Sequence, residues 1–243
     1  MIPSDLHNAS GERLAFSFVP GTGDYRDIVV MGHGVTSDKD RPWSCALSTA
    51  LAAAGVASLR IAFSGNGESE GSFADSTITK AVGDLGSVLD ALEGWNVSYV
   101  GHSMGGATGV LRAARDTRIR ALVSLAAVTH SDEFVERMFG DLQPGEPMLG
   151  KEHCPFSLAL REDLITIGST TGCAQSITVP WLLVHGTADD IVPIAHSRDL
   201  HAAARGRSEL TELEDVDHAF TGDGLEQFVH AVVPWLLRHS SPG

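Results

Sequence analysis

Residues 96–115 read NVSYVGHSMGGATGVLRAAR. The first five residues have the character of a buried strand, and the last ten have the composition of a helix. Between them stands GHSMG, Gly101 to Gly105, in the G-x-S-x-G pattern that is typical of a sharp strand-to-helix turn. Glycines on both sides of the serine let the two backbones pass closely. The stretch predicts a strand–turn–helix unit in which Ser103 is a candidate nucleophile.

The same pattern occurs a second time as GESEG, from Gly67 to Gly71. Three residues separate it from the preceding apolar run, and SFADSTITK follows before any helical segment. Its serine stands between two carboxylates, which would disfavour the oxyanion that acyl transfer creates. We therefore interpret Ser69 as a loop residue and Ser103 as the nucleophile.

The rest of the chain alternates short apolar runs with longer helical segments. Strands are predicted at 13–19, 27–33, 56–63, 96–102, 119–128, 180–186 and 208–214, and helices at 43–55, 76–94, 105–116, 195–206 and 224–239. Most strands from Asp27 onward are nearly continuous apolar runs, which suits a parallel sheet covered by helices on both faces. The sequence predicts one α/β domain over residues 1–243, with a doubly wound, mostly parallel sheet.

Residues 131–179 interrupt this alternation with three prolines and two short helical pieces. The segment is long for a connection inside a compact domain. We interpret it as a small helical lid insertion over Ser103, and a single crossover helix with ragged ends is the alternative. Some of its large apolar side chains are expected to line a substrate pocket. The candidates are Phe134, Met138, Phe139, Met148, Leu149, Phe156, Leu158, Leu160, Leu164 and Ile165.

A serine nucleophile needs a general base and a carboxylate that orients this base. Functional groups of a parallel α/β sheet collect at the carboxyl ends of its strands. After the strand at 180–186 come Asp189 and Asp190, and after the strand at 208–214 comes His218. The order Ser103, then an aspartate, then His218 is the one expected for this strand–turn–helix class.

The loop after the strand at 27–33 reads MGHGVTSDKDRPW. The His33-Gly34 pair turns the chain so that the amide of Val35 can point toward Ser103, and we interpret His33 as a structural residue of this turn. The amide of Met104 stands at a helix N-terminus, where backbone N–H groups favour negative charge. Val35 and Met104 are therefore the predicted backbone donors of an oxyanion hole.

Together these motifs resemble the α/β-hydrolase family of serine esterases. The likeness runs from about residue 27 to 220 and rests on HG (33–34), GNGES (65–69), GHSMGG (101–106), HGTADDIVP (185–193) and DHAF (217–220). The family's H-G-x-x-D-x-x-V-P motif implies Asp189 rather than Asp190 as the triad acid. The family also carries a G-x-G-x-S loop, which Gly65, Gly67 and Ser69 fill here. One departure is Ala62-Phe63-Ser64, where relatives often have an acidic residue before the aromatic.

The 131–179 insertion and the HGVTSDKDRPW loop look most like the cinnamoyl and feruloyl esterase branch. The resemblance implies a serine carboxylesterase for small to medium, feruloyl-type esters. Monoacylglycerol lipases, short-acyl esterases and some peptidases share this frame and are alternatives. Further alternatives are a perhydrolase or haloperoxidase with the same triad, and a non-catalytic binding protein of this fold.

The formal net charge of −14 argues against a nucleic-acid partner. Cys45, Cys154 and Cys173 form no CxxC pair and are interpreted as buried or incidental thiols. We expect no signal peptide, no membrane span and a cytoplasmic protein, since no stretch has the required apolar run. No cofactor or metal is expected, and a small ester is the expected partner of a monomer or homodimer. Four histidines show no metal-ligand spacing with a further ligand, and we interpret them as structural or surface residues: His185, His196, His201 and His230.

Overall fold

The computed structural model describes residues 4–22 and 26–239. Residues 1–3 of the N-terminal stretch, on which the signal-peptide expectation partly rests, lie outside these ranges. The elements in chain order are β1 (Phe16–Val19), β2 (Asp27–Gly32), α1 (Pro42–Ala53), β3 (Ala57–Ile61), η1 (Phe73–Asp75), α2 (Ile78–Ala91), β4 (Asn96–His102), α3 (Met104–Ala113), β5 (Ile119–Leu125), α4 (Ser131–Phe139), β6 (Pro147–Met148), β7 (Lys151–Pro155), α5 (Leu158–Ile167), η2 (Thr171–Ser176), β8 (Trp181–Gly186), α6 (Ala195–Ala203), β9 (Glu209–Leu213) and α7 (Asp223–His239).

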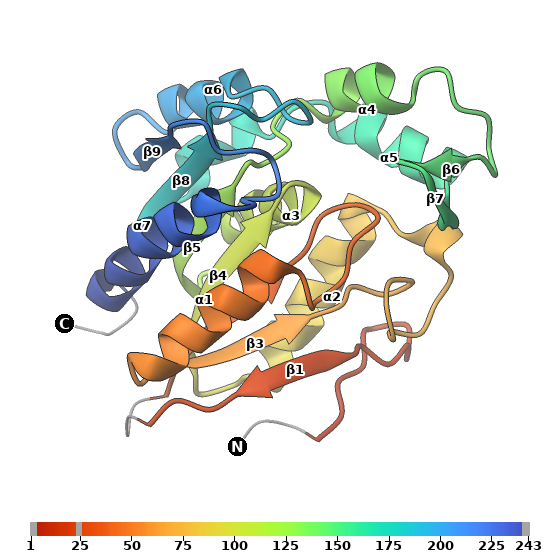
Figure 1. The fold of residues 1–243 in the computed structure, drawn as a ribbon. Coiled ribbons are helices and arrows are strands. Elements are labelled where there is room, and N and C mark those ends of the chain that lie inside the picture. The colour runs from red at the N-terminus through yellow and green to blue at the C-terminus, as the bar shows by residue number, and fades with distance from the viewer. Residues whose placement is uncertain (1–3, 23–25, 240–243) are drawn as a thin grey trace.

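Seven strands form one twisted sheet in the order β1-β3-β2-β4-β5-β8-β9 (Figure 1). Strand β1 pairs antiparallel with β3 at one edge, and the remaining strands are all parallel. The order reverses at β2, because β3 lies on one side of it and β4 on the other. Such a switch point gathers loops at the carboxyl ends of the central strands. The predicted α/β fold with a doubly wound, mostly parallel sheet is confirmed.

Helices cover both faces of the sheet because the central strands are buried on both sides. Along β2, Val29 and Met31 pack with α1 and α7, whereas Ile28 and Val30 pack with α2 and α3. This alternation follows from the period of two residues in a strand. The loops at the carboxyl edge of the sheet therefore start from strands that are packed on both faces.

The segment between β5 and β8 contains α4, the β6–β7 hairpin, α5 and η2. Helices α4 and α5 and the hairpin lie at the upper right of Figure 1, whereas η2 contacts α6. Most large apolar side chains of the segment are buried in one cluster with Ile78, Val82 and Met104 of the sheet domain. Leu149, at the turn of the hairpin, is 44 % exposed. The sequence predicted two short helical pieces in this segment, which α4 and α5 confirm, but it did not predict the hairpin.

Among residues 4–22 and 26–239, none of the helices combines the length and apolarity that crossing a bilayer requires.

Candidate active site

Ser103 stands in the turn between β4 and α3, with backbone angles φ 56° and ψ −118°. A positive φ is unusual for a residue other than glycine and costs roughly 1–3 kcal/mol. The surrounding structure fixes it: the Ser103 amide donates to Leu125 O at 2.8 Å, and Ser103 O accepts from the amide of Gly106 at 3.0 Å. The turn therefore holds the hydroxyl at the carboxyl edge of the sheet at the expense of local strain.

Three glycines of the turn are required because a side chain at any of these positions would clash with neighbouring atoms. A Cβ on Gly101 would lie 2.1 Å from Gly105 O, and a Cβ on Gly105 would lie 2.5 Å from Gly32 O. A Cβ on Gly106 would lie 2.6 Å from the Cβ of Ala127. Helix α3 can begin directly against strands β2, β4 and β5 only because these positions carry no side chain.

His218 and Asp189 are joined by a hydrogen bond of 2.7 Å between Nδ1 and Oδ2. Asp189 follows β8 and His218 follows β9, so these two strands supply the pair. Asp190, the alternative acid, is exposed, and its carboxylate has no hydrogen-bond partner in the described ranges. The geometry brings Asp189, and not Asp190, to the histidine.

Four donors surround the buried carboxylate of Asp189. Its Oδ1 accepts from the amides of Ile191 and Val192, and its Oδ2 lies 3.1 Å from Nε2 of His185 in addition to His218. Burial alone would raise the pKa of Asp189, but the bonds from His185 and His218 hold this pKa well below its usual range. Asp189 is therefore ionised and requires a proton on Nδ1 of His218. The lone pair of His218 then stays on Nε2, where a general base needs it.

His102, directly before Ser103, packs against the proposed base. Its ring centroid lies 4.6 Å from that of His218, and its Nε2 lies 2.8 Å from the carbonyl oxygen of His218, to which it must donate. Burial and the neighbouring His218 lower the pKa of His102 to about 3. His102 is therefore a neutral donor that positions the His218 loop.

The loop with the predicted oxyanion donor Val35 packs directly on the turn. A Cβ on Gly34 would lie 2.8 Å from the Cβ of Ser103, so this loop approaches Ser103 closely. The His33 ring fixes the loop because its Nε2 accepts from the amide of Phe63 at 3.1 Å and its Nδ1 lies 2.8 Å from Gly34 O. Met104, the other predicted donor, is the first residue of α3, where an amide has no partner within the helix.

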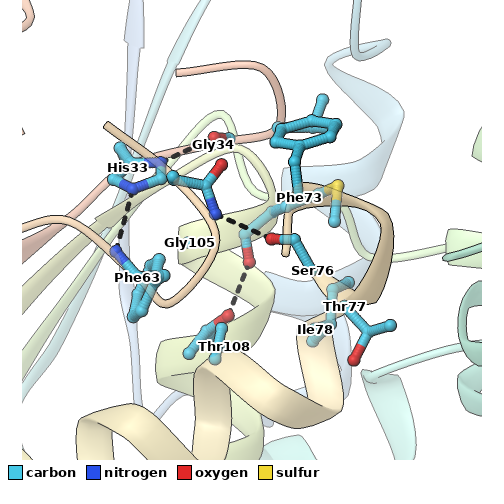
Figure 2. A pocket seen from close by; sticks show the side chains of 13 residues that line it. His33, Gly34, Phe63, Phe73, Ser76, Thr77, Ile78, Gly105 and Thr108 are labelled. Atoms are coloured by element: carbon cyan, nitrogen blue, oxygen red, sulfur yellow. Dashed lines mark hydrogen bonds between the residues drawn. The ribbon is translucent and has the colours of Figure 1, made fainter. Parts of the chain in front are cut away.

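Two pockets adjoin these groups. The first, of about 120 Å³, contains both Ser103 and His218 and is also lined by Val35, Leu149 and Ile191. Within the described ranges no hydrogen bond joins Ser103 to His218, and such bonds often tighten only when substrate binds. The second has about 30 Å³, room for roughly two water-sized groups. Figure 2 shows the second pocket, and its lining includes Val35, Phe73, Ile78, Met104 and Thr108.

The other residues singled out in the sequence have partners elsewhere in the fold. Ser69 donates to Ala62 O at 2.7 Å and accepts from the amide of Ala15 at 2.8 Å, so its hydroxyl ties a loop to the sheet edge. His196 accepts from the amide of Thr129, and His201 contacts Ser208, while His230 is exposed. Across 4–22 and 26–239, no group of three or more His, Cys, Asp or Glu side chains is arranged to hold a metal ion.

Sequence reasoning missed His102, and it named His185 only as one of several structural or surface histidines. His185 is fully buried, its Nδ1 lies 2.7 Å from the Ser197 hydroxyl, and its Nε2 reaches Asp189. The signal for both was present, because each is the histidine inside a motif already quoted, GHSMG and HGTADD. The departure at 62–64 also has a structural counterpart: Ser64 donates to the buried carboxylate of Asp84, which comes from α2.

Comparison with known proteins identifies a family whose sequence model matches this chain. A family model described as serine aminopeptidase S33 matches residues 23–149, slightly more than half of the chain. No curated protein matches the sequence.

Solved structures are similar over nearly the whole chain. Est1E from Butyrivibrio proteoclasticus with bound ferulic acid has a TM-score of 0.84 at 21 % identity, covering 98 % of this chain and 99 % of its own. The esterase domain of a Rhodothermus marinus protein has a TM-score of 0.77 at 23 % identity, covering 98 % of each chain. A Paleococcus ferrophilus monoacylglycerol lipase has a TM-score of 0.77 at 22 % identity, covering 93 % of this chain and 99 % of its own. At these identities the likeness concerns the fold.

Proposed function

The chain belongs to the hydrolase family described as serine aminopeptidase S33, and we propose that it hydrolyses carboxylic esters through Ser103, His218 and Asp189. The observation that carries the proposal is the 2.7 Å bond between His218 and Asp189. It leaves Nε2 of His218 as the basic nitrogen, in the same pocket as a serine held at φ 56°. The three residues follow β4, β8 and β9, whose carboxyl ends lie at one edge of the sheet.

The reaction would proceed in two acyl-transfer steps. His218 takes the proton of Ser103 as its Oγ attacks the ester carbonyl, and the amides of Val35 and Met104 bind the oxyanion. The imidazolium then protonates the leaving alcohol, and the acyl group stays on Ser103. Water, activated by His218, releases the acid and restores the serine. Asp189 stabilises the imidazolium in both steps and remains ionised, in keeping with its lowered pKa.

An ester panel with two matched variants tests this proposal. We expect wild-type protein to hydrolyse p-nitrophenyl acetate and methyl ferulate faster than alanine p-nitroanilide, which probes the peptidase chemistry in the family's name. Asp189→Asn should lower kcat roughly 10³–10⁴-fold, because the imidazole loses its partner, whereas Asp190→Asn should change it less than about threefold. Cleavage of the anilide alone, or a loss confined to Asp190→Asn, would contradict the proposal.

For the acyl group, the likeness to Est1E with ferulic acid supports hydroxycinnamoyl esters as candidates. We assign residues 131–179 as a lid that acts through the hairpin turn, because Leu149 and Lys151 line the pocket of Ser103 whereas most large apolar residues of the segment are buried elsewhere. Leu149 would then contact the aromatic acyl group. Such a contact shifts discrimination by about 1–3 kcal/mol.

The lid assignment has a matched pair of variants. Leu149→Ala should lower kcat/KM for methyl ferulate relative to p-nitrophenyl acetate by about tenfold or more. Leu158, which is 54 % exposed and lies outside the pocket, is the control, and Leu158→Ala should leave the ratio unchanged. If both variants keep the wild-type ratio, the hairpin turn does not select the acyl group.

A further inference from the structure

Arg41 is a partly buried cation without a partner. It precedes α1, and within the described ranges its guanidinium takes part in no hydrogen bond or ion pair. Other partly buried arginines are paired: Arg60 with Asp40, Arg112 with Asp116, and Arg161 with the carbonyl oxygens of Phe139 and Gly140. The five N–H donors of its planar fork are therefore available to a ligand that replaces water at this position.

The Arg41 side chain lines the pocket of Ser103 and also an adjoining pocket of about 380 Å³. The two pockets share Thr36, Ser37, Arg41 and Lys151, so this group forms the boundary between them. The adjoining pocket continues away from the nucleophile toward Gly65 and His153. A molecule reacting at Ser103 can therefore extend past Arg41 into this second space.

Lys151 adds a second positive charge on the same boundary. Its Nζ donates to Thr36 O at 2.6 Å, which uses one of the three ammonium donors and leaves two. Asp38 is the one carboxylate lining the adjoining pocket, and its Oδ1 already accepts from the amide of Asp40. Two cations therefore face one carboxylate there, in a chain whose net charge is −14. An anion would meet a local field opposite to that of the whole molecule.

The charge of Arg41 is also felt at the catalytic edge. Burial is the main cause of the lowered pKa values of His33 and His102, and the nearby Arg41 lowers both further. The same charge can act on a substrate in the pocket that Ser103, His102 and Arg41 line.

We propose that Arg41 and Lys151 recognise a carboxylate on the ester substrate, so that the site selects esters that carry a free acid group beside the bond that is cleaved. This inference rests on the proposed ester hydrolysis. The planar guanidinium matches a carboxylate with two parallel hydrogen bonds, and Lys151 adds a point charge. The carboxylate is unchanged by the reaction, in which water is added across the ester bond to give an acid and an alcohol.

Two pairs of substrates distinguish a carboxylate on the acyl side from one on the alcohol side. The acyl pair is p-nitrophenyl hemiglutarate and p-nitrophenyl pentanoate, and the alcohol pair is 4-acetoxybenzoate and 4-acetoxybenzamide. The measurement is the ratio of kcat/KM between the charged and the neutral member of each pair. In Arg41→Gln this ratio should fall tenfold or more for at least one pair, mainly through KM, because a charge-assisted hydrogen bond made equally in ground and transition states is lost.

Arg115→Gln is the matched control, because Arg115 is exposed, lies beyond the far end of α3 from Ser103, and carries the same charge. Its ratios should stay within twofold of wild type, which excludes an effect of net charge alone. Unchanged ratios for both pairs in Arg41→Gln would overturn the inference, and so would equal losses in Arg41→Gln and Arg115→Gln.

Binding without turnover separates this inference from the proposed function. In a Ser103→Ala background, the dissociation constant of monomethyl glutarate, measured by ligand-observed NMR, should rise at least tenfold when Arg41→Gln is added. If that dependence holds but wild-type protein cleaves no ester, the ester function falls and the carboxylate site stands. If neutral esters are cleaved and monomethyl glutarate binds equally with and without Arg41, the carboxylate site falls and the ester function stands.

Discussion

The two G-x-S-x-G loops of this chain have the same sequence pattern, but different residues of the pattern have a positive φ. In the 67–71 loop the glycines take the positive φ, +54° at Gly67 and +98° at Gly71, and the serine has ordinary angles. In the 101–105 turn the serine takes the positive φ of 56°, and Gly101 and Gly105 are needed for close contact instead. Glycine in this pattern therefore has two uses, and only one of them strains the serine.

The hydroxyls differ in the same way. That of Ser69 is occupied at 2.7 Å by Ala62 O and at 2.8 Å by the amide of Ala15. That of Ser103 lines a pocket together with His218. A hydroxyl already engaged in two structural hydrogen bonds is not free to be activated by a base, which supports the proposal that Ser103, and not Ser69, is the nucleophile.

Removing each hydroxyl gives the largest expected contrast. Ser103→Ala should lower kcat for p-nitrophenyl acetate by roughly 10⁴-fold or more, since members of a triad act as a unit. Ser69→Ala should stay within about tenfold but lower the free energy of unfolding by about 1–3 kcal/mol, because the buried amide of Ala15 loses its acceptor. Steady-state kinetics and urea unfolding measure both. Labelling of Ser69 by a fluorophosphonate would reverse the assignment of the two loops.

The sequence was sufficient to predict which of the two loops forms a strand–turn–helix unit, because the feature that separates them is local. A buried strand ends directly at Gly101 and a helix begins at Met104, whereas Gly67 is separated from its strand. The positions of Asp189 and His218 were also predictable, because both directly follow a strand and parallel strands end at one edge. The hydrogen bond between them is a property of the folded chain.

A methyl group on one glycine of each loop gives the next contrast, in stability. At Gly101 the new Cβ would lie 2.1 Å from a backbone oxygen, so Gly101→Ala should cost roughly 3 kcal/mol through overpacking. At Gly67 the nearest atom is the Cβ of Asp38 at 3.3 Å, so Gly67→Ala should cost only the left-handed backbone strain of about 1–2 kcal/mol. Unfolding midpoints in urea measure both. Equal losses of stability would mean that the two glycines have the same structural role.

Other parts of the site could not be predicted from residue patterns. The β6–β7 hairpin has two residues in one strand and five in the other, and its turn contains Leu149 at a positive φ of 50°. Such short pairs depend on tertiary packing and leave little periodicity in the sequence. The contact of His102 with His218 joins residues 116 positions apart, and no spacing rule for one chain encodes it.

The edge of the sheet around Ser103 contains buried neutral imidazoles, so acid should lower its stability. Burial lowers the pKa of His33 to about 4 and is the main cause of the pKa of about 3 at His102. Both values lie below the 6.5 of an unperturbed histidine, so the unfolded state binds more protons below pH 6.5. This contribution to stability is complete above about pH 6.5 and is lost as the pH falls toward the folded-state values, by about 1.4 kcal/mol per pH unit and group.

Thermal unfolding between pH 7 and pH 4.5 measures this loss. His33→Gln, which keeps a donor and an acceptor, should flatten the dependence of Tm on pH. His230→Gln, at an exposed position, should leave the slope unchanged. If His33→Gln has the wild-type slope, this imidazole does not couple acid to the stability of the catalytic edge.

The smallest effect is expected from the charge next to Ser69. Glu68 is 72 % exposed and lies 2.7 Å from Nζ of Lys39, which also pairs with Asp40. Burial would lower the pKa of Lys39, but the two carboxylates raise it overall. Glu68→Gln leaves one carboxylate on the lysine, so the free energy of unfolding should fall by less than about 1 kcal/mol, and less still in 0.5 M NaCl.

The same substitution, combined with Glu70→Gln in a Ser103→Ala background, tests whether the two carboxylates alone prevent Ser69 from acting as a nucleophile. We expect no recovered hydrolysis, because the Ser69 hydroxyl would still donate to Ala62 O and would still lack a base. Recovery that depends on Ser69 would mean that the carboxylates, and not the backbone of the loop, separate the two copies of the pattern.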